Sequence, residues 1–372
     1  MKTKFLLPIL IFFVQISFAH RTEKDIMETK AGKLIALSKI GGEIGKFKDK
    51  NEGIVILNRA LSQAKKLKNK WYKEVTLAEI AIEYSGLGEH DMALDITNNI
   101  KDKHLFSTNL GKIANKLAKT NPEKAKGLLE SAVNKIRVSE HKNEIPAVLA
   151  ELSGRYEKLN QIDLANNLLE EALQIIESQS NIPLYEKLST YAEIAANLVA
   201  VGNKEKAFAL FDKAYVLSNN LNNPFEKAAI LAMLGGELAE KGQPQKALVM
   251  LEKAQQAASM IEDKNKKNDI LSEITRNLSQ AKENAKAEIL SKSIDDYYFL
   301  TEGLIRIAKN YSKIQQQEKA LGLLNDSIIA AKKINSNSKK ALTFAKIASE
   351  LANIEQNTKA LQLLSEAMSS IS

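Results

Sequence analysis

The stretch "YAEIAANLVAVGNKEKAFALFDKA" (Tyr191–Ala214) places small residues at regular intervals among large apolar ones, with one glycine between its two halves. In the first half, the large apolar residues follow the i, i+3, i+7 spacing of one helix face around Ile194. In the second half, Ala207 and Ala214 are seven positions apart and share one helical stripe. The pattern therefore predicts two helices that turn at Gly202 and approach each other closely.

The first half of this stretch recurs along the chain, each time with an Ile or Leu, called the anchor here, followed by a small residue. The nine anchors are Ile40, Ile80, Ile113, Leu152, Ile194, Leu234, Ile274, Ile307 and Ile347. Their sequence numbers differ successively by 40, 33, 39, 42, 40, 40, 33 and 40. A sustained period of this length is the signature of a protein built from structural repeats.

The second half recurs with the first, so each repeat is predicted to be a pair of antiparallel helices. Gly88, Gly202 and Gly242 stand where the first helix has to end, which suits a left-handed C-cap. Pro122 and Pro244 begin second helices, where the missing N–H costs nothing. The whole chain after its first residues is therefore predicted to be all-α.

The combined pattern resembles the tetratricopeptide repeat (TPR). Tyr84, Tyr156 and Tyr311 match the aromatic position of that family's first helix, and Phe211 and Leu251 match the apolar position of its second. The resemblance implies a right-handed superhelical solenoid of about nine helix pairs. The period of about 40 residues exceeds the family's usual ~34, and two-helix repeats of the armadillo and HEAT kinds are the alternative.

The N-terminal sequence suggests an exported protein. Residues 1–19 have a basic start, a short apolar core and a small-x-small cleavage site, which predicts a secretory signal peptide; an uncleaved anchor is the alternative. Residues 20–30 are predicted to be a linker and residues 31–372 the solenoid, with a joint near residues 291–300. After cleavage we expect a periplasmic or secreted protein with no stable membrane insertion.

The family resemblance also implies a function: a protein or peptide partner lies on the concave face, which the first helices form. The candidate contact residues are Glu151, Gly154, Glu193, Ala196, Gly236, Glu240, Arg276, Arg306, Lys309 and Lys313. These residues predict a groove with a small-residue centre and a basic end, suited to a peptide with acidic residues on one side. The alternative is that the small residues only permit helix packing and that the bases are solvated.

Several other functions are disfavoured by the composition. The chain has no cysteine, and no two of its four histidines have the spacing of a helical zinc pair. No nucleophile elbow is found, so we expect no catalysis, no metal and no cofactor. The net charge of +8 is interspersed with acids, so no nucleic-acid binding is expected. The alternative functions are a structural spacer in an envelope complex, or an enzyme or carbohydrate-binding protein with a pocket on the concave face.

The last repeat raises a separate expectation. The sequence continues for only a few residues past its second helix, so no further helix is available to cover its apolar side. Leu361 and Leu364 are therefore expected to be partly exposed or to contact a second copy, which would form a homodimer through the C-terminal repeat.

Overall fold

The computed structural model describes residues 26–27 and 29–371, and all regular structure in them is helical. The predicted signal peptide and most of the predicted linker lie outside these residues. The described chain folds into eighteen α-helices and one short 3₁₀-helix, without a strand. The predicted all-α solenoid of antiparallel helix pairs is confirmed.

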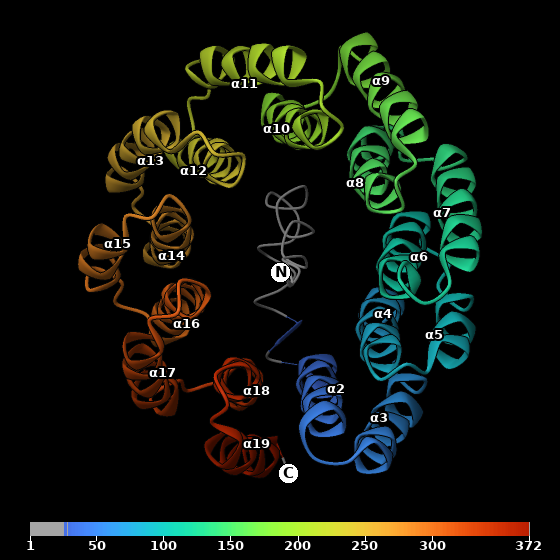
Figure 1. Ribbon diagram of the computed structural model, residues 1–372, viewed down its shortest axis with the longest axis vertical. Helices are drawn as coiled ribbons and strands as arrows, with labels where there is room; N and C mark the ends of the chain where they lie inside the picture. Colours follow the sequence, from blue (N-terminus) through green and yellow to red (C-terminus); the bar gives the residue numbers. More distant parts are fainter. Residues whose placement is uncertain (1–25, 28, 372) are drawn as a thin grey trace.

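The helix pairs follow one another around a ring, with one helix of each pair on the inner side and one on the outer side (Figure 1). The inner helices are α2 (Lys30–Phe47), α4 (Lys70–Gly86), α6 (Lys103–Leu117), α8 (Ile145–Lys158), α10 (Leu184–Ala200), α12 (Pro224–Glu240), α14 (Lys264–Gln280), α16 (Tyr297–Lys313) and α18 (Asn337–Asn353). The outer helices are α3 (Lys50–Ala64), α5 (His90–Thr97), α7 (Pro122–Arg137), α9 (Ile162–Ser178), α11 (Lys204–Ser218), α13 (Pro244–Ser259), α15 (Asn284–Ser291), α17 (Gln317–Lys332) and α19 (Asn357–Ile371).

The core of each repeat is built from the residues that carried the sequence pattern. All nine anchors are fully buried, and so are the paired alanines of the outer helices, among them Ala207 and Ala214. Because an alanine adds only a methyl group to the helix surface, inner and outer helices pack at close range and large apolar residues fill the space between repeats. One buried cluster runs from the first repeat to the eighth, and a second joins the last repeats to the first.

The turns after the inner helices also follow the prediction. Gly88, Gly202 and Gly242 have φ values of +83°, +90° and +76°, in the left-handed region that favours glycine. The same place, eight positions after the anchor, is taken in four other repeats by residues with a side chain, which adopt the same conformation: Asn160, Lys282, Gln315 and Glu355. The turn geometry is therefore set by the repeat and not by glycine alone.

Two repeats have a shortened outer helix, which explains the two short separations in the sequence. Helices α5 and α15 have eight residues each, whereas the other outer helices have 15 to 17. About seven residues, two helical turns, are missing from each. The predicted joint near residues 291–300 begins at the end of α15, and its role as a joint remains a prediction.

The ring closes because the first inner helix packs against the last repeat (Figure 1). Helix α2 contacts both α18 and α19, just as each inner helix contacts both helices of the pair before it. Apolar residues from both ends of the chain, such as Ile40 and Leu364, form one buried cluster. Ile26 and Met27, assigned above to a linker, are buried in the same cluster.

This closure overturns one expectation. Leu364 is only 1% exposed, because α2 of the same chain covers the face that was expected to be open. Leu361 is half-buried, as the sequence led us to expect. A homodimer through the C-terminal repeat was expected because the sequence predicts an open apolar face here, and that reason no longer holds.

Candidate functional site

The inner helices share one position at which every repeat carries a polar or charged residue, and this position was not recognised from the sequence. It lies three positions after the anchor and is called the seam position here, because several of its residues reach the preceding inner helix. Its nine residues are Glu43, Glu83, Lys116, Arg155, Asn197, Glu237, Asn277, Asn310 and Glu350. Together with their neighbours they form the inner face of the ring.

Three seam residues are asparagines, and all three tie neighbouring inner helices together; Asn310 does so through the hydroxyl of Ser279 in α14, at 2.9 Å. The amide of Asn197 donates to the carbonyl of Ala150 in α8 at 3.1 Å, and Asn277 donates to the carbonyl of Ala232 in α12 at 2.7 Å. In both cases the acceptor lies two positions before the anchor of the preceding repeat. A buried amide–carbonyl hydrogen bond of this kind holds the two helices in a defined register.

The glycines expected in the floor of the groove make room for these asparagines. A Cβ on Gly236 would lie 2.8 Å from three atoms of Asn277, and one on Gly154 would overlap the Asn197 amide. Gly236 and Ala196 are buried, and Gly154 is half-buried. These small residues therefore serve helix packing, which was the alternative weighed from the sequence, and do not form an open apolar floor.

Charged seam residues at the two ends of the chain form ion pairs between inner helices. The Lys39 ammonium of α2 lies 2.7 Å from the Glu43 carboxylate and 3.1 Å from that of Glu83 in α4. Burial disfavours the charge on Lys39, but the two carboxylates outweigh it and the pKa of Lys39 is raised. Lys309 of α16 pairs with Glu350 of α18 at 2.6 Å. At these two junctions, the charges of the inner face are therefore matched.

Three other cations of the inner face, Arg306, Lys313 and Lys158, have no carboxylate within ion-pair distance among the described residues. Burial and the neighbouring Arg276 lower the pKa of Arg306, and burial and Lys309 lower that of Lys313. Burial, reinforced by the charge of Arg155, lowers the pKa of Lys158 to about 8, and its ammonium has no hydrogen-bond partner in the described chain. Cations held close together and partly out of water attract anionic groups.

The acids on the adjoining part of the inner face show the opposite effect. Burial, reinforced by Glu151 and Glu237, raises the pKa of Glu193 well above its usual range. Burial and the charge of Glu240 raise the pKa of Glu237 to about 7. Both carboxylates belong to neighbouring inner helices, α10 and α12, and neither forms an ion pair or a hydrogen bond in the described part of the chain.

The outer side of the ring is different, because its charges pair from helix to helix. At each of three successive junctions, the acid lies five positions after the first buried alanine of one outer helix. The lysine lies one position before the first buried alanine of the next outer helix. The pairs are Glu170–Lys206, Asp212–Lys246 and Glu252–Lys286. The buried ionisable groups that lack such pairs thus gather on the inner side of the ring.

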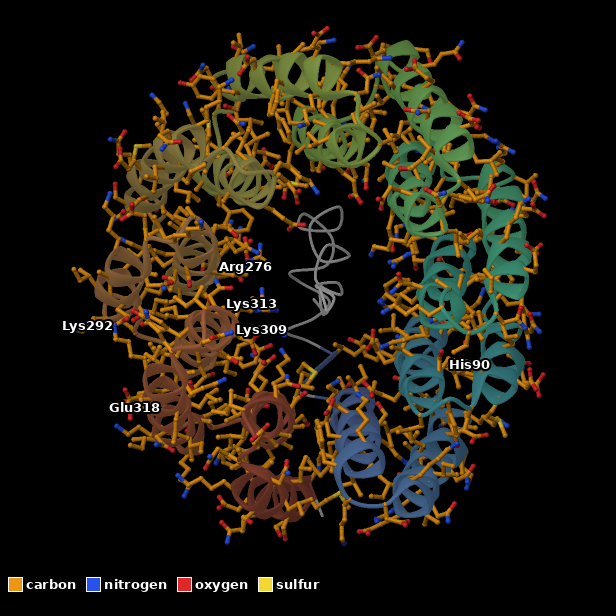
Figure 2. The ribbon with its side chains drawn as sticks, viewed as in Figure 1. His90, Arg276, Lys292, Lys309, Lys313 and Glu318 are labelled. Carbon is orange, nitrogen blue, oxygen red and sulfur yellow. The ribbon has the colours of Figure 1, made fainter. Side chains whose placement is uncertain are left out.

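The structure brings the predicted basic residues together. Figure 2 shows Arg276, Lys309 and Lys313 on the side of α14 and α16 that faces the middle of the ring, whereas Lys292 and Glu318 lie on the outer side. Arg276 is itself engaged by Glu273 of its own helix. Among the predicted acids, Glu151 binds Arg155 at 2.6 Å and Glu240 is exposed.

Sequence reasoning missed Glu237, Lys158 and the three seam asparagines. Glu237 occupies the position that Asn197 and Asn277 occupy in the flanking repeats. An alignment of the repeats on their anchors would have shown that a carboxylate stands there in place of an amide. The partners themselves lie on the preceding repeat, far outside the window of any local pattern.

A serine–histidine contact has a structural explanation. Ser85 Oγ lies 3.1 Å from His90 Nδ1, and burial lowers the pKa of His90. At the same register of another repeat with a short outer helix, Ser279 Oγ bonds the side chain of Asn284 at 2.6 Å. Because asparagine replaces histidine without loss of the contact, this pair closes the turn between inner and outer helix.

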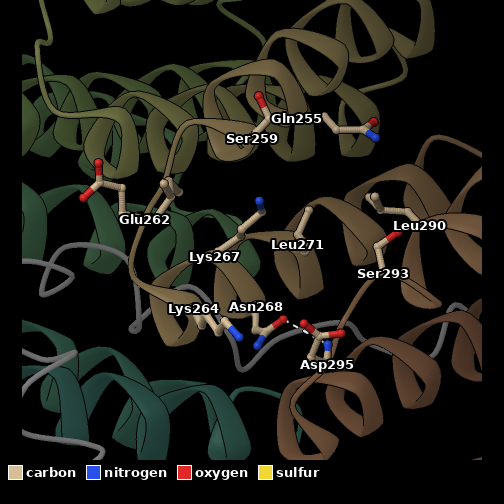
Figure 3. Close-up of a pocket in the computed structure, with 11 residues that line it drawn as sticks. Gln255, Ser259, Glu262, Lys264, Lys267, Asn268, Leu271, Leu290, Ser293 and Asp295 are labelled. Atoms are coloured by element: carbon tan, nitrogen blue, oxygen red, sulfur yellow. Dashed lines mark hydrogen bonds between the residues drawn. The ribbon is translucent and has the colours of Figure 1, made fainter.

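A hollow of about 450 Å³ lies beyond the end of the short helix α15 (Figure 3). Polar and apolar residues both line it, among them Lys267 and Asn268 of α14 and Asp295, whose backbone N–H donates to the Asn268 amide oxygen at 3.1 Å. Leu290 near the end of α15 and Ser293 just after it also line the hollow. No group of three or more His, Asp or Glu side chains in the described residues is arranged to hold a metal ion. None of the helices described is long and apolar enough to cross a membrane.

Fold and inner face together define a closed ring of helix-pair repeats with unpaired charges on its inner side. No family model matches the sequence, and no curated protein is similar to it. Among solved structures, a Rap protein bound to competence and sporulation factor is 14% identical, covers 90% of this chain and 99% of its own, and has a TM-score of 0.37.

Two further solved structures give similar values. A signal-transduction ATPase from Pyrococcus horikoshii with a tetratricopeptide repeat sensor is 13% identical over 98% of this chain and 65% of its own, with a TM-score of 0.36. A circular tandem repeat protein is 12% identical over 93% of this chain and 96% of its own, with a TM-score of 0.28. These low scores do not by themselves establish a shared fold or function, so the architecture rests on the structure of the chain itself.

Proposed function

We propose that the protein is a non-enzymatic interaction scaffold that binds a peptide or an extended segment of a partner protein on the inner face of the ring. The observation that carries this proposal is the distribution of charge: outer helices pair their charges, while Arg306, Lys313 and Lys158 on the inner side have no acidic partner among the described residues. Leaving charges unpaired and partly dehydrated costs stability, so such residues are candidates for ligand contacts.

The chemistry of the inner face suggests the character of the partner. The cations of α16 that lack acidic partners in the described chain, Arg306 and Lys313, would bind acidic side chains or a terminal carboxylate, with Lys309 beside them. The small residue after each anchor, and the paired alanines that let the two helices of a repeat pack closely, support the TPR-like interpretation of the repeats. The N-terminal sequence supports an exported location, periplasmic or secreted.

A selection of random peptides tests the proposal. Peptides displayed on phage would be selected on the ring and counter-selected on a variant with Arg306→Gln and Lys313→Gln. We expect acidic peptides whose affinity drops at least tenfold in that variant and is unchanged when the outer residue Lys292 is replaced by Gln. Peptides that bind both variants as tightly as the native ring would show that the inner face is not the binding site.

A structural spacer is the second candidate function, and the closed ring favours it to some extent, because closure gives a rigid body of fixed diameter. A spacer would yield no selectable peptide, and its envelope partners would cross-link to outer helices. Photo-crosslinking from Lys313 and from Lys292 in intact cells separates the two functions.

A further inference from the structure

We propose that Glu193 and Glu237 form a site for one organic cation, such as the guanidinium of a partner's arginine side chain, between inner helices α10 and α12. The inference rests on the proposed function, since it assigns a second chemical feature to a ligand of the inner face. The partner would then carry a basic group here in addition to the acidic groups that Arg306 and Lys313 attract.

The first argument is the cost of the carboxylates as they stand. Glu193 is 4% exposed and Glu237 is 7% exposed, yet neither side chain makes an ion pair or hydrogen bond within the described residues. Holding a carboxylate in a largely buried position without a partner is unfavourable, because partial loss of water disfavours its charge, and the charge of Glu237 adds to that effect on Glu193. A single cation between them would relieve both penalties.

The second argument comes from the register of the repeats. In the repeats on either side, the seam position holds Asn197 and Asn277, each of which donates to a backbone carbonyl of the preceding helix. Glu237 occupies the same position, and an ionised carboxylate has no hydrogen to donate there. Of these three successive seam positions, 197 and 277 therefore hold an amide that donates a hydrogen bond, and only 237 holds a carboxylate, which accepts one.

The charges around the site leave it without a cation from the described chain itself. From α8, Arg155 is held by Glu151; from α14, Arg276 is held by Glu273. On α12, Glu240 adds a negative charge and forms an ion pair with Lys241 at 3.7 Å. On α8, Glu151 adds a second negative charge that acts on Glu193.

The class of ligand follows from the donor set. Two carboxylates without a third ligand do not make a metal site, and no three-residue group suited to a metal occurs in the described chain. A guanidinium offers several N–H donors in a planar fork and is only weakly hydrated, so it tolerates a partly buried site between two acids. A neutral amide would leave the repulsion between the carboxylates in place.

Binding of the cation is coupled to proton release. At neutral pH the two acids hold protons part of the time, because burial raises both pKa values, that of Glu237 to about 7. The cation binds the ionised form, and the displaced proton goes to the solvent. With a pKa of about 7 the ionised fraction of Glu237 rises about tenfold between pH 6 and pH 8. The affinity should therefore rise at least about tenfold, because ionisation of Glu193 adds to the effect.

The experiment uses N-acetyl-arginine amide as the probe and N-acetyl-citrulline amide as its neutral, nearly isosteric control. Binding to the full chain is measured by calorimetry at pH 6 and pH 8, in buffers of different ionisation enthalpy, which reports released protons. We expect the arginine compound to bind, with the rise in affinity and the proton release, and the citrulline compound not to bind.

Two variants and a control locate the site. Glu237→Gln preserves shape and adds a donor. It should reduce the affinity at pH 8 at least tenfold and weaken the pH dependence to the part that Glu193 contributes; Glu193→Gln should reduce the affinity similarly. Glu252→Gln, an exposed acid of the outer side, should change nothing. Equal binding of both compounds, or binding that survives Glu237→Gln unchanged, would overturn the proposal.

The outcome is separable from that of the proposed function. If selected peptides bind the inner face through Arg306 and Lys313 but ignore Glu237→Gln, the scaffold function stands and the cation site is wrong. If the arginine compound binds with proton release while no peptide is selected, the cation site stands and the peptide-binding proposal is wrong.

Discussion

Replacing Gly236 by alanine should destabilise the ring, although alanine is the better helix former. The new Cβ would lie 2.8 Å from the Cγ, Nδ2 and Oδ1 atoms of Asn277, too close for any real contact. Overpacking of this kind costs ~1–3 kcal/mol, and displacement of the Asn277 amide from the Ala232 carbonyl costs a further ~1–3 kcal/mol. The gain in helix propensity offsets ~1 kcal/mol, so the net loss is about 1–5 kcal/mol.

A matched control is available in the same chain. Gly127 lies in the outer helix α7, and no atom lies within 4 Å of the place that its Cβ would take, so Gly127→Ala should stabilise by about 0.5–1 kcal/mol. Urea unfolding followed by circular dichroism measures both variants. The double variant Gly236→Ala/Asn277→Ala should recover part of the loss, with a coupling energy of at least about 1 kcal/mol. If Gly236→Ala is as stable as the native chain, or if the two effects simply add, the account of the seam is incorrect.

Three further predictions concern closure, turns and pH. Leu364→Asp places a charge in the closure cluster and should open the ring, seen as a larger radius of gyration in small-angle scattering with helix content retained, whereas Val216→Asp on the outer surface should leave the radius unchanged. Gln315→Gly should stabilise by about 0.5–1 kcal/mol in denaturant unfolding, because Gln315 has a φ of +63° that glycine adopts without strain. The pKa of Glu237 is raised from 4.5 to about 7, so the folded state holds a proton that the unfolded state has lost; its contribution to stability is complete below about pH 4.5 and is lost as the pH rises to 7. Glu237→Gln should remove at most about 3 kcal/mol of this pH dependence, and an unchanged stability–pH curve would contradict the assignment.

The repeat and its turns could be predicted because the relevant forces act within one helix pair. The spacing of anchors and small residues reports which face of each helix is buried, and Gly202 and Pro244 mark helix ends through backbone restrictions that do not depend on the rest of the chain. The two short separations likewise correspond to α5 and α15, the two shortened outer helices. Local rules sufficed for each of these features.

The candidate site was predicted less well, because its properties depend on contacts between repeats. Arg306 and Lys313 were singled out by position and do lack acidic partners in the part of the chain that the structure describes, but Gly236 was taken for an open surface and is filled by Asn277 of the next repeat. Whether a small residue is open to a ligand or packed against its neighbour depends on the side chain that the following repeat places against it. The sequence identifies that side chain but does not indicate which residue of the preceding repeat it contacts.

Closure of the ring could not be predicted for a geometrical reason. Nine helix pairs complete the circuit in the described chain, so each pair turns on average by one ninth of a full circle. A change of one tenth in that angle, repeated at every junction, would accumulate to nearly the width of a whole repeat and leave the ring open or overlapping. Side-chain patterns fix which faces pack but leave the angle between packed helices with a scatter of ~15–20°. The angle is instead settled by the sum of all junctions, including the seam contacts of Asn197 and Asn277, and the last junction brings Ile40 and Leu364 into one core. Weakening a seam contact anywhere in the circuit should therefore strain the closing junction between α2 and α18, even where that seam lies far from this junction.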